Sequence, residues 1–260
     1  MNKDWLVFTD LDGTLLDHHT YDATPAQPAL ERLREANIPV VPVSSKTLAE
    51  LEDLKQSLGF DGPVIAENGA VIAYPGEAPQ VAPSGYLLIR DFLIDHRANP
   101  RFDNRGFGDM SLEEVMQHTS LTRPQAQAAR KRLASEPFVW RSHPDDLDAF
   151  RFVVQQSGLR LTRGGRFLHL MGDTDKGMAV KLVVKHLRGM GQTISRTVAL
   201  GDSENDRDML LAVDQPVIVM KPDGSHLQLP ERPDALLTEL PGPGGWNQAM
   251  LTLMKQTDRP

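Results

Sequence analysis

Short apolar runs separated by helical patterns occur near both ends of the chain, and this arrangement restricts the fold more than any other feature. Trp5–Thr9, Ile38–Val43 and Val64–Ala66 have the composition of strands buried on both faces. Thr24-Pro25 and the capping box Thr47–Glu50 predict helix starts between these strands. Strands and helices in this order predict a parallel sheet with right-handed crossovers.

The middle of the chain follows a different pattern. Residues 75–85 contain three prolines and two glycines, which is typical of a connection between domains. Helices are expected after Ser111 and Thr122. Three short, turn-separated runs predict antiparallel strands: Phe150–Val154, Leu159–Thr162 and Phe167–Met171.

The first pattern returns after Lys176, with a helix expected to about Arg188 and buried strands at Thr197–Leu200 and Val217–Met220. A helix is expected from about Asn205 between these strands. We therefore predict an α/β fold: a Rossmann-like core formed by residues 1–85 and 172–260, with an inserted α+β domain at 86–171.

Composition excludes several classes of function. The chain has no cysteine, so disulfides, thiolate nucleophiles and zinc–cysteine sites are excluded. Its net charge of −7 argues against a nucleic-acid partner. No apolar run reaches the roughly 18–20 residues of a membrane span, and no secretory signal is recognisable, so we expect a cytoplasmic protein with no membrane partner. The sequence predicts no oligomeric state.

Two carboxylates directly follow the first predicted strand, in the segment Asp10-Leu11-Asp12-Gly13-Thr14. Side chains at positions i and i+2 of extended backbone face the same side, so Asp10 and Asp12 can act on one substrate. A carboxylate that attacks phosphorus forms an acyl phosphate and splits a difficult reaction into two steps. The second carboxyl group can protonate the leaving oxygen and later deprotonate water.

Further polar residues follow other predicted strands or open a helix. The Ser44 hydroxyl can donate to a phosphoryl oxygen, and the Lys176 ammonium at a helix start suits an anion. Asp202 and Asp206 add carboxylates, and clustered carboxylates call for a hard divalent cation such as Mg²⁺. Each motif alone is as well explained by a turn, a cap or a surface lysine. The ordered set favours a magnesium-dependent reaction on a small anionic phosphorylated substrate.

This ordered set resembles the haloacid dehalogenase superfamily, whose first motif matches Asp10–Leu15 in full. The resemblance implies that Asp10 is the nucleophile and Asp12 the general acid/base. It further implies that Ser44 and Lys176 hold the phosphoryl group. The implied Mg²⁺ ligands are the Asp10 side chain, the Asp12 backbone carbonyl and the Asp202 side chain, with support from Asn205 and Asp206. The insertion has the position of a type C2 cap, subtype C2B, the lid of these enzymes.

Four segments resemble the mannosyl-3-phosphoglycerate phosphatases more specifically: Pro42–Thr47, Glu67–Ala70, Gly106–Met110 and Gly165–Leu170. The similarity extends from about residue 5 to the mid-220s. That family removes the 3-phosphate from mannosyl-3-phosphoglycerate and releases mannosylglycerate. Because this substrate also carries a carboxylate, the insertion should supply cations and N–H groups. The candidates are Arg163, Gly164, Gly165, Arg166 and His169 in the insertion, with Lys46 as a candidate from the core side.

The alternatives for these residues remain open. Arg163 and Arg166 can equally be exposed hairpin arginines, and His169 a structural histidine between two leucines. The substrate can be another sugar phosphate or phospho-acid, such as glucosyl-3-phosphoglycerate or phosphoglycolate. A phosphomutase is disfavoured because only about 30 residues separate Asp12 from Ser44. A non-catalytic binding protein with the same fold is a remote alternative.

Overall fold

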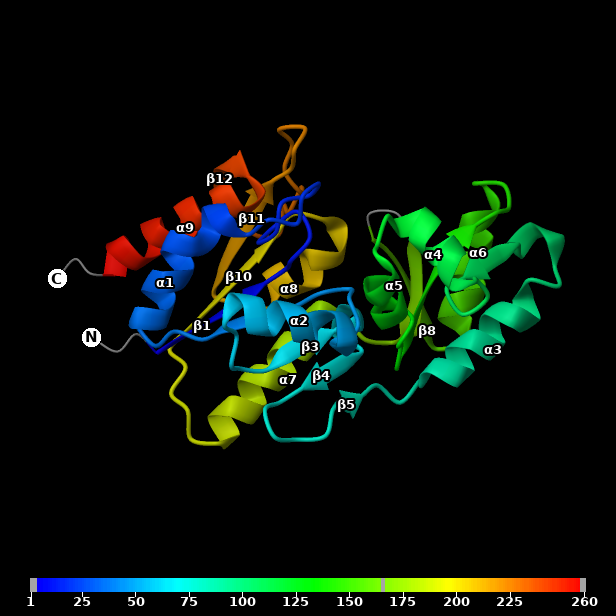
Figure 1. Ribbon diagram of the computed structural model, residues 1–260, viewed down its shortest axis with the longest axis horizontal. Coiled ribbons are helices and arrows are strands. Elements are labelled where there is room, and N and C mark those ends of the chain that lie inside the picture. Colours follow the sequence, from blue (N-terminus) through cyan, green and yellow to red (C-terminus); the bar gives the residue numbers. More distant parts are fainter. Residues whose placement is uncertain (1–3, 165–166, 258–260) are drawn as a thin grey trace. The chain divides into compact units, whose positions relative to one another are not determined.

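The computed structural model describes residues 4–164 and 167–257 (Figure 1). The chain forms two compact units. The first unit comprises residues 1–44, 60–65 and 176–260, and the second comprises residues 45–59 and 66–175. The second unit is thus larger than the predicted inserted domain, because residues 45–59 and 66–85 pack with it. The boundaries of the inserted domain at residues 86 and 171 stay a prediction.

The first unit is built on a parallel sheet of five strands in the order β12-β11-β10-β1-β2. All five residues of β1 are buried, as the sequence predicts for a strand covered on both faces. Helices α1 and α9 pack together on one side of this sheet, and α7 and α8 lie on the other (Figure 1). The strands are β1 (Trp5–Thr9), β2 (Val40–Pro42), β10 (Arg196–Gly201), β11 (Gln215–Met220) and β12 (Leu236–Pro241). The helices are α1 (Gln27–Glu35), α7 (Lys176–Gly189), α8 (Arg207–Leu211) and α9 (Gly242–Thr257).

The second unit contains an antiparallel sheet in the order β6-β7-β9-β8. One hydrophobic cluster packs α3 and α6 with this sheet, and another forms around α4 and α5. Helix α2 and a small sheet in the order β3-β4-β5 precede these elements in the chain. The strands are β4 (Val71–Ala73), β5 (Gln80–Val81), β6 (Asn104–Gly106), β7 (Ser135–Trp140), β8 (Leu159–Arg163) and β9 (Leu168–Gly172). Of β3 (Val64–Ala66), only Ala66 belongs to this unit, and Val64 and Ile65 belong to the first. The helices are α2 (Leu48–Leu58), α3 (Tyr86–His96), α4 (Leu112–Thr119), α5 (Arg123–Ala129) and α6 (Asp146–Gln156).

The α/β fold, the parallel sheet and the antiparallel character of the insertion are confirmed. The predicted strand Phe150–Val154 is wrong, because these residues lie inside α6. Phe150 and Val154 are fully buried four positions apart, which is the helical spacing, while Phe152 between them is 63% exposed. Acidic residues in the first turn of α6 also favour the helix. The strands of this antiparallel sheet that are missing from the prediction are β6 and β7.

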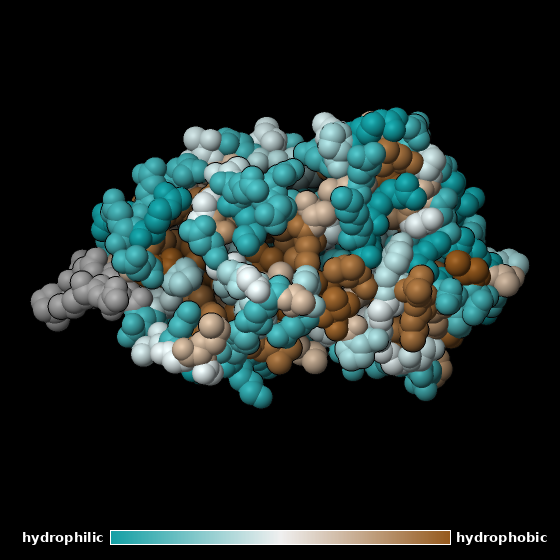
Figure 2. Space-filling view, turned by 60° about the horizontal axis from the view of Figure 1, so that its bottom comes forward, coloured by the Kyte–Doolittle hydropathy of each residue, from teal (hydrophilic) through white to brown (hydrophobic). Residues whose placement is uncertain are grey.

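The surface carries apolar side chains in separate places. On the face drawn in Figure 2, hydrophobic areas alternate with a predominantly hydrophilic surface. In the second unit, Leu87 and Leu88 of α3 are exposed, and in the first unit Met178 and Leu182 of α7 are exposed. Within residues 4–164 and 167–257, no helix combines the length and the apolar composition that crossing a membrane requires.

Candidate functional site

Asp10 directly follows the carboxyl end of β1, an interior strand with β10 on one side and β2 on the other. Its N–H donates to the Leu200 carbonyl at 2.9 Å, which fixes its backbone against β10. Gly13 turns the chain with a φ of +84°, a conformation that glycine adopts at little cost. A Cβ at this position would lie 3.2 Å from a carboxylate oxygen of Asp202, so Gly13 also permits this close approach.

Ser44 lies just beyond the carboxyl end of β2, the strand next to β1. The Val43 N–H donates to the Thr9 carbonyl at 2.8 Å. Ser44 and Asp10 are the next residues of these two adjacent chain segments, so they lie side by side. Ser44 is 1% exposed, and its N–H donates to the Ile65 carbonyl. The sequence therefore placed Ser44 correctly at the carboxyl edge of the sheet.

Lys176 is the first residue of α7 and is 1% exposed. Its Nζ donates to Oδ1 of Asp10 and to Oδ1 of Asp206, each at 2.6 Å. Burial alone would lower the pKa of this ammonium, but the two adjacent carboxylates raise it above its ordinary value. Lys176 therefore stays charged and holds Asp10 and Asp206 in fixed positions.

Asp202 and Asp206 follow β10 and differ in their contacts. One oxygen of Asp206 accepts from Lys176, and the other accepts from the N–H groups of Asp202 and Ser203. Asp206 is therefore fully engaged by protein donors. Asp202 accepts at Oδ1 from the Thr14 hydroxyl at 3.1 Å. Its Oδ2 is the atom that approaches Gly13, so this second oxygen faces the nucleophile loop.

The charge of this cluster is unbalanced. Asp10, Asp202 and Asp206 each offer one oxygen within 4.8 Å of the others, and among the described residues one ammonium, that of Lys176, hydrogen-bonds to them. Burial raises the pKa of Asp10 well above its ordinary value, and the charge of Asp206 adds to this effect. Burial, with the same neighbour, raises the pKa of Asp202 to about 7. Hard oxygen ligands in a site that is short of positive charge fit a divalent cation.

The other predicted core residues lie in the same unit. Asp12 is half-buried, two residues beyond Asp10, and forms a backbone bridge with Leu16. Asn205 is half-buried and accepts at its side-chain oxygen from the Ser203 hydroxyl. The cluster of side-chain carboxylates contains Asp206 and not Asp12. The predicted metal ligand of Asp12 is its backbone carbonyl, which does not belong to a cluster of side-chain groups.

The described substrate-binding candidates, Lys46 from the predicted core and the others from the insertion, belong to the second unit. Lys46 is half-buried, and Arg163 is exposed at the end of β8. His169 is 5% exposed on β9, and a Cβ at Gly164 would lie 2.9 Å from its Nε2, so only glycine fits beside the ring. Gly165 and Arg166 lie outside the described residues.

Two contacts of the site were missed by sequence reasoning. Thr14 holds Asp202 through its hydroxyl, and its place in the nucleophile loop could have suggested such a role. The Trp246 indole donates to the Thr9 hydroxyl at 2.9 Å, directly before Asp10. Trp246 lies in α9, in a proline- and glycine-rich tail whose composition gives no signal for this contact.

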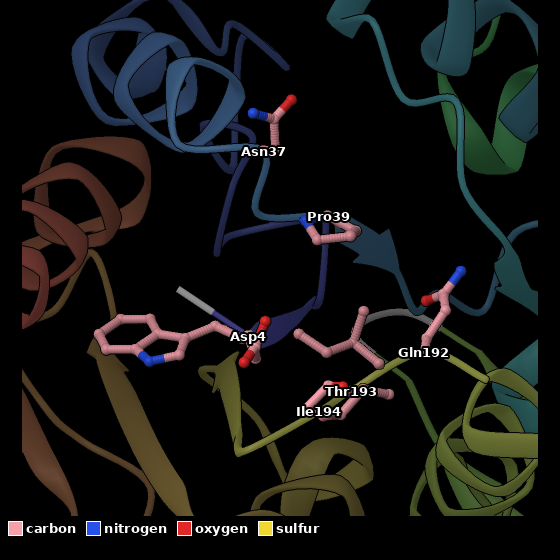
Figure 3. A pocket seen from close by; sticks show the side chains of 8 residues that line it. Asp4, Asn37, Pro39, Gln192, Thr193 and Ile194 are labelled. Carbon is pink, nitrogen blue, oxygen red and sulfur yellow. The ribbon is translucent and has the colours of Figure 1, made fainter. Parts of the chain in front are cut away.

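A pocket at the opposite, amino-terminal edge of the sheet is a poor alternative site (Figure 3). It lies where β1 begins, whereas Asp10 follows the end of that strand. Its one charged lining residue is Asp4, so it offers no cation to an anionic substrate. The lining residues are Asp4, Trp5, Leu6, Asn37, Pro39, Gln192, Thr193 and Ile194.

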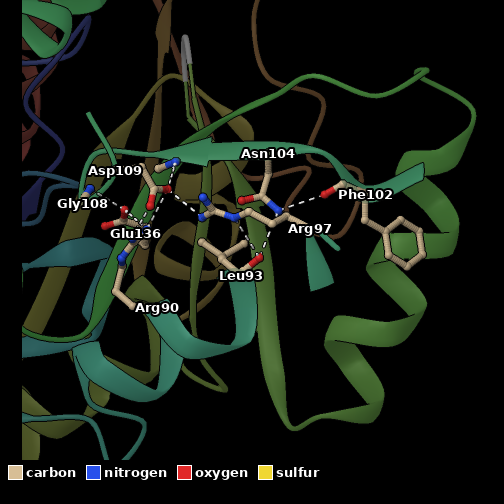
Figure 4. Close-up of polar contacts among 9 residues, drawn as sticks. Arg90, Leu93, Arg97, Phe102, Asn104, Gly108, Asp109 and Glu136 are labelled. Carbon is tan, nitrogen blue, oxygen red and sulfur yellow. Dashed lines mark hydrogen bonds and ion pairs between the residues drawn. The ribbon is translucent and has the colours of Figure 1, made fainter. Parts of the chain in front are cut away.

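The second unit has a charged cluster of its own, which is balanced (Figure 4). Asp109 accepts from Arg90 and Arg97, and Glu136 accepts from Arg90 and from the Gly108 N–H. Burial opposes the ionisation of Asp109, but the two guanidinium groups lower its pKa below the ordinary value. Burial raises the pKa of Glu136. Two carboxyl groups thus face two guanidinium groups, and the cluster needs no further cation.

Known proteins resemble this chain over nearly its whole length. Residues 7–81 match the family model described as haloacid dehalogenase-like hydrolase. A glucosyl-3-phosphoglycerate/mannosyl-3-phosphoglycerate phosphatase of Persephonella marina is 36% identical, covering 98% of both chains. A protein of the same name from Methanococcoides burtonii is 39% identical, covering 96% of this chain and 97% of its own. A crystal structure of a Thermoplasma acidophilum protein has the same fold, with a TM-score of 0.71, 22% identity and coverage of 96% and 97%.

Proposed function

The chain belongs to the haloacid dehalogenase-like hydrolases, in the group that includes glucosyl-3-phosphoglycerate/mannosyl-3-phosphoglycerate phosphatases, and on this premise we propose that it removes the 3-phosphate from a glycosyl-3-phosphoglycerate with the help of Mg²⁺. The observation that carries the proposal is the buried cluster of Asp10, Asp202 and Asp206 around Lys176. Mannosyl-3-phosphoglycerate is the first candidate substrate, and the glucosyl ester is the second.

Asp10 is the proposed nucleophile. Its Oδ1 is held by Lys176, so the second oxygen of the carboxylate can attack phosphorus. The new bond between this oxygen and phosphorus forms as the bond from phosphorus to the glycerate oxygen breaks, which yields an aspartyl phosphate. The ion pair with Lys176 favours the ionised carboxylate that this attack requires.

Asp12 is the proposed general acid and base. It donates a proton to the leaving glycerate oxygen, and it then takes a proton from the water that hydrolyses the aspartyl phosphate. Its place two residues from Asp10 and its partial exposure to solvent support this role. Inorganic phosphate leaves, and Asp10 is regenerated.

The remaining core residues bind and orient. Ser44, beside Asp10 at the edge of the sheet, donates to a phosphoryl oxygen together with Lys176. Asp206 positions Lys176 and the backbone of Asp202, and Asn205 lies next to it. Bound Mg²⁺, held by Asp10, Asp202 and the Asp12 carbonyl, would neutralise charge on the phosphoryl group.

Cations of the inserted domain are proposed to recognise the glycerate carboxylate. Arg163 and His169 are the described candidates in this domain, and Lys46 is the candidate from the core side. The N–H of Gly164, a further predicted candidate, already donates to the Phe167 carbonyl at 3.0 Å. The exposed Arg163 is the last residue of β8 and pairs with Leu168, and the buried His169 is the next residue of β9 and pairs with Thr162, so both lie near the turn that joins these strands. A cytoplasmic location is part of the same proposal.

The test is phosphate release from mannosyl-, glucosyl- and unglycosylated 3-phosphoglycerate and from phosphoglycolate, compared as kcat/KM with Mg²⁺ present. We expect a glycosyl ester to exceed the unglycosylated acids by at least about tenfold, because sugar contacts made in the transition state add to kcat/KM. Equal weak turnover of all four esters would contradict the proposed substrate. Loss of activity in EDTA and its return with Mg²⁺ would support the metal.

A further inference from the structure

Two buried ionic side chains of the second unit have no part in the proposed reaction. Arg132 is 8% exposed and Glu67 is fully buried. Burying such groups is costly unless they are paired and hydrogen-bonded, so their partners indicate their purpose.

Arg132 binds the backbone of the segment that follows Ser44. Its Nη1 donates to the Ser45 carbonyl at 2.8 Å and to the Ser135 hydroxyl at 3.2 Å. Its Nε donates to the Ala129 carbonyl at the end of α5. One planar guanidinium group therefore joins three separate points, and a lysine ammonium could not reproduce this geometry.

Glu67 holds the other side of the same arrangement. Its carboxylate accepts from the N–H groups of Leu133 and Ala134 at 2.8 and 3.1 Å and from the Ser135 hydroxyl at 2.7 Å. Its own N–H donates to the Lys46 carbonyl at 2.9 Å. The Ser135 hydroxyl thus links Glu67 to Arg132.

Three consecutive residues after Ser44 are anchored in this way. The Ser45 carbonyl is bound by Arg132, the Lys46 carbonyl by the Glu67 N–H, and the Thr47 hydroxyl donates to the Ala128 carbonyl at 2.9 Å. Residues 45–47 are hereafter called the anchored loop. Its conformation therefore depends on the segment from α5 to β7.

The backbone at Glu67 is strained. Glu67 and Asn68 have φ values of +50° and +57°, in the left-handed region that side chains other than glycine avoid, and Gly69 continues with +98°. Such a conformation persists only where the surroundings enforce it, and strain of this kind concentrates at functional sites. The buried carboxylate bonds of Glu67 provide that enforcement.

We propose that Arg132 and Glu67 are positioning residues: they hold the anchored loop so that the preceding Ser44 presents its hydroxyl to the phosphoryl group. The inference rests on the proposed function, because it takes Ser44 as a phosphoryl ligand. Every phosphate ester shares this group, so loss of the anchor lowers activity on all of them alike. A residue that recognises the sugar or the glycerate would affect the glycosyl substrate alone.

The test compares Arg132→Lys with the wild-type protein on p-nitrophenyl phosphate and on the glycosyl-3-phosphoglycerate. We expect kcat/KM to fall about tenfold for both substrates, the effect of losing one charged hydrogen bond that orients the site. The dissociation constant of inorganic phosphate, measured by calorimetry with Mg²⁺ present, should rise by a similar factor. This binding measurement tests the role of Arg132 even if the proposed glycosyl-3-phosphoglycerate is not the substrate.

Arg90→Lys is the matched control. Arg90 is also a largely buried arginine of the second unit, but its partners are Asp109 and Glu136 and not the anchored loop. It should lower the melting temperature comparably while changing kcat/KM and phosphate affinity less than about twofold. Ser135→Ala, which removes only the hydroxyl between Glu67 and Arg132, should give a smaller loss of the same kind if Arg132→Lys does not fold. Wild-type kcat/KM in the Arg132 and Ser135 variants, or losses equal to those of Arg90→Lys, would overturn the inference.

Discussion

The two units of this chain treat buried charge in opposite ways. In the first unit, three carboxylates surround one ammonium at the carboxyl edge of a parallel sheet. In the second, Asp109 and Glu136 face Arg90 and Arg97, so two carboxyl groups meet two guanidinium groups. Both clusters are largely buried, so burial alone does not distinguish a reactive site from a structural one.

The balance of charge makes the distinction. The pKa values of Asp10 and Asp202 are raised, because burial and the neighbouring Asp206 disfavour their ionised forms. The pKa of Asp109 is lowered, because two guanidinium groups outweigh its burial, although burial raises the pKa of Glu136 in the same cluster. A cluster that lacks positive charge can be completed by a cation and an anionic substrate, whereas a neutralised cluster serves the fold. The predictions below would break or sharpen this contrast.

The largest effect is expected at Asp10. Asp10→Asn removes the proposed nucleophile and a proposed metal ligand, so phosphate release should fall by at least about a thousandfold. Asp17→Asn is the control, because Asp17 is an aspartate of the same loop region that binds only nearby groups such as the His19 and Thr20 N–H groups. Magnesium-dependent activity that survives Asp10→Asn would show the nucleophile assignment to be wrong.

Asp109→Asn should lower the stability of the protein and leave kcat nearly unchanged. It leaves Arg90 and Arg97 with less compensation, so the free energy of unfolding should fall by about 2–3 kcal/mol, somewhat less than for a fully buried pair. Denaturant unfolding measures this loss. The kcat for p-nitrophenyl phosphate per folded molecule should stay within about twofold of wild type. A large loss of kcat at unchanged stability would erase the contrast between the two clusters.

The stability gained from Mg²⁺ should depend on pH. The folded, metal-free protein raises the pKa of Asp202 from 3.8 to about 7, so between these values it binds a proton that the unfolded chain releases. Stability without metal therefore falls as pH rises through this window, and Mg²⁺ takes the place of the proton. The gap between the melting temperatures in Mg²⁺ and in EDTA should be small at pH 5 and largest above pH 7. A gap that does not change with pH would contradict the unbalanced cluster.

Trp246→Phe should have the smallest effect. It keeps most of the buried aromatic volume but removes the indole hydrogen bond to Thr9, so unfolding should become easier by about 1 kcal/mol. The denaturation midpoint measures this change. Because Thr9 directly precedes Asp10, the kcat of the same variant also shows whether the hydrogen bond from Trp246 to Thr9 contributes to catalysis.

The sequence predicted the parallel core and the order of its motifs well, because strands buried on both faces are nearly continuous apolar runs. β1, β10 and β11 illustrate this. It failed where a pattern is ambiguous: Phe150–Val154 is too short for its apolar composition to separate strand from helix. β12 and α9 were missed because α9 begins in Gly-Pro-Gly-Gly, a composition typical of a loop.

The candidate site was predicted only in part. The positions of Asp10, Ser44, Lys176 and Asp202 follow from the strands and helix that carry them, so sequence order was enough. The contacts of Arg132 and Glu67 join residues more than 60 positions apart, and no local pattern encodes such a pairing. The roles of the site residues stay predictions that the experiments above address.

The most direct test of the central contrast is a calorimetric titration with Mg²⁺ of wild-type protein, Asp202→Asn and Asp109→Asn. The account predicts one ion per chain in the wild type, unchanged binding in Asp109→Asn, and affinity reduced by at least about tenfold in Asp202→Asn. Undiminished Mg²⁺ binding by Asp202→Asn, or its loss in Asp109→Asn, would contradict the claim that the unbalanced carboxylates form the metal site.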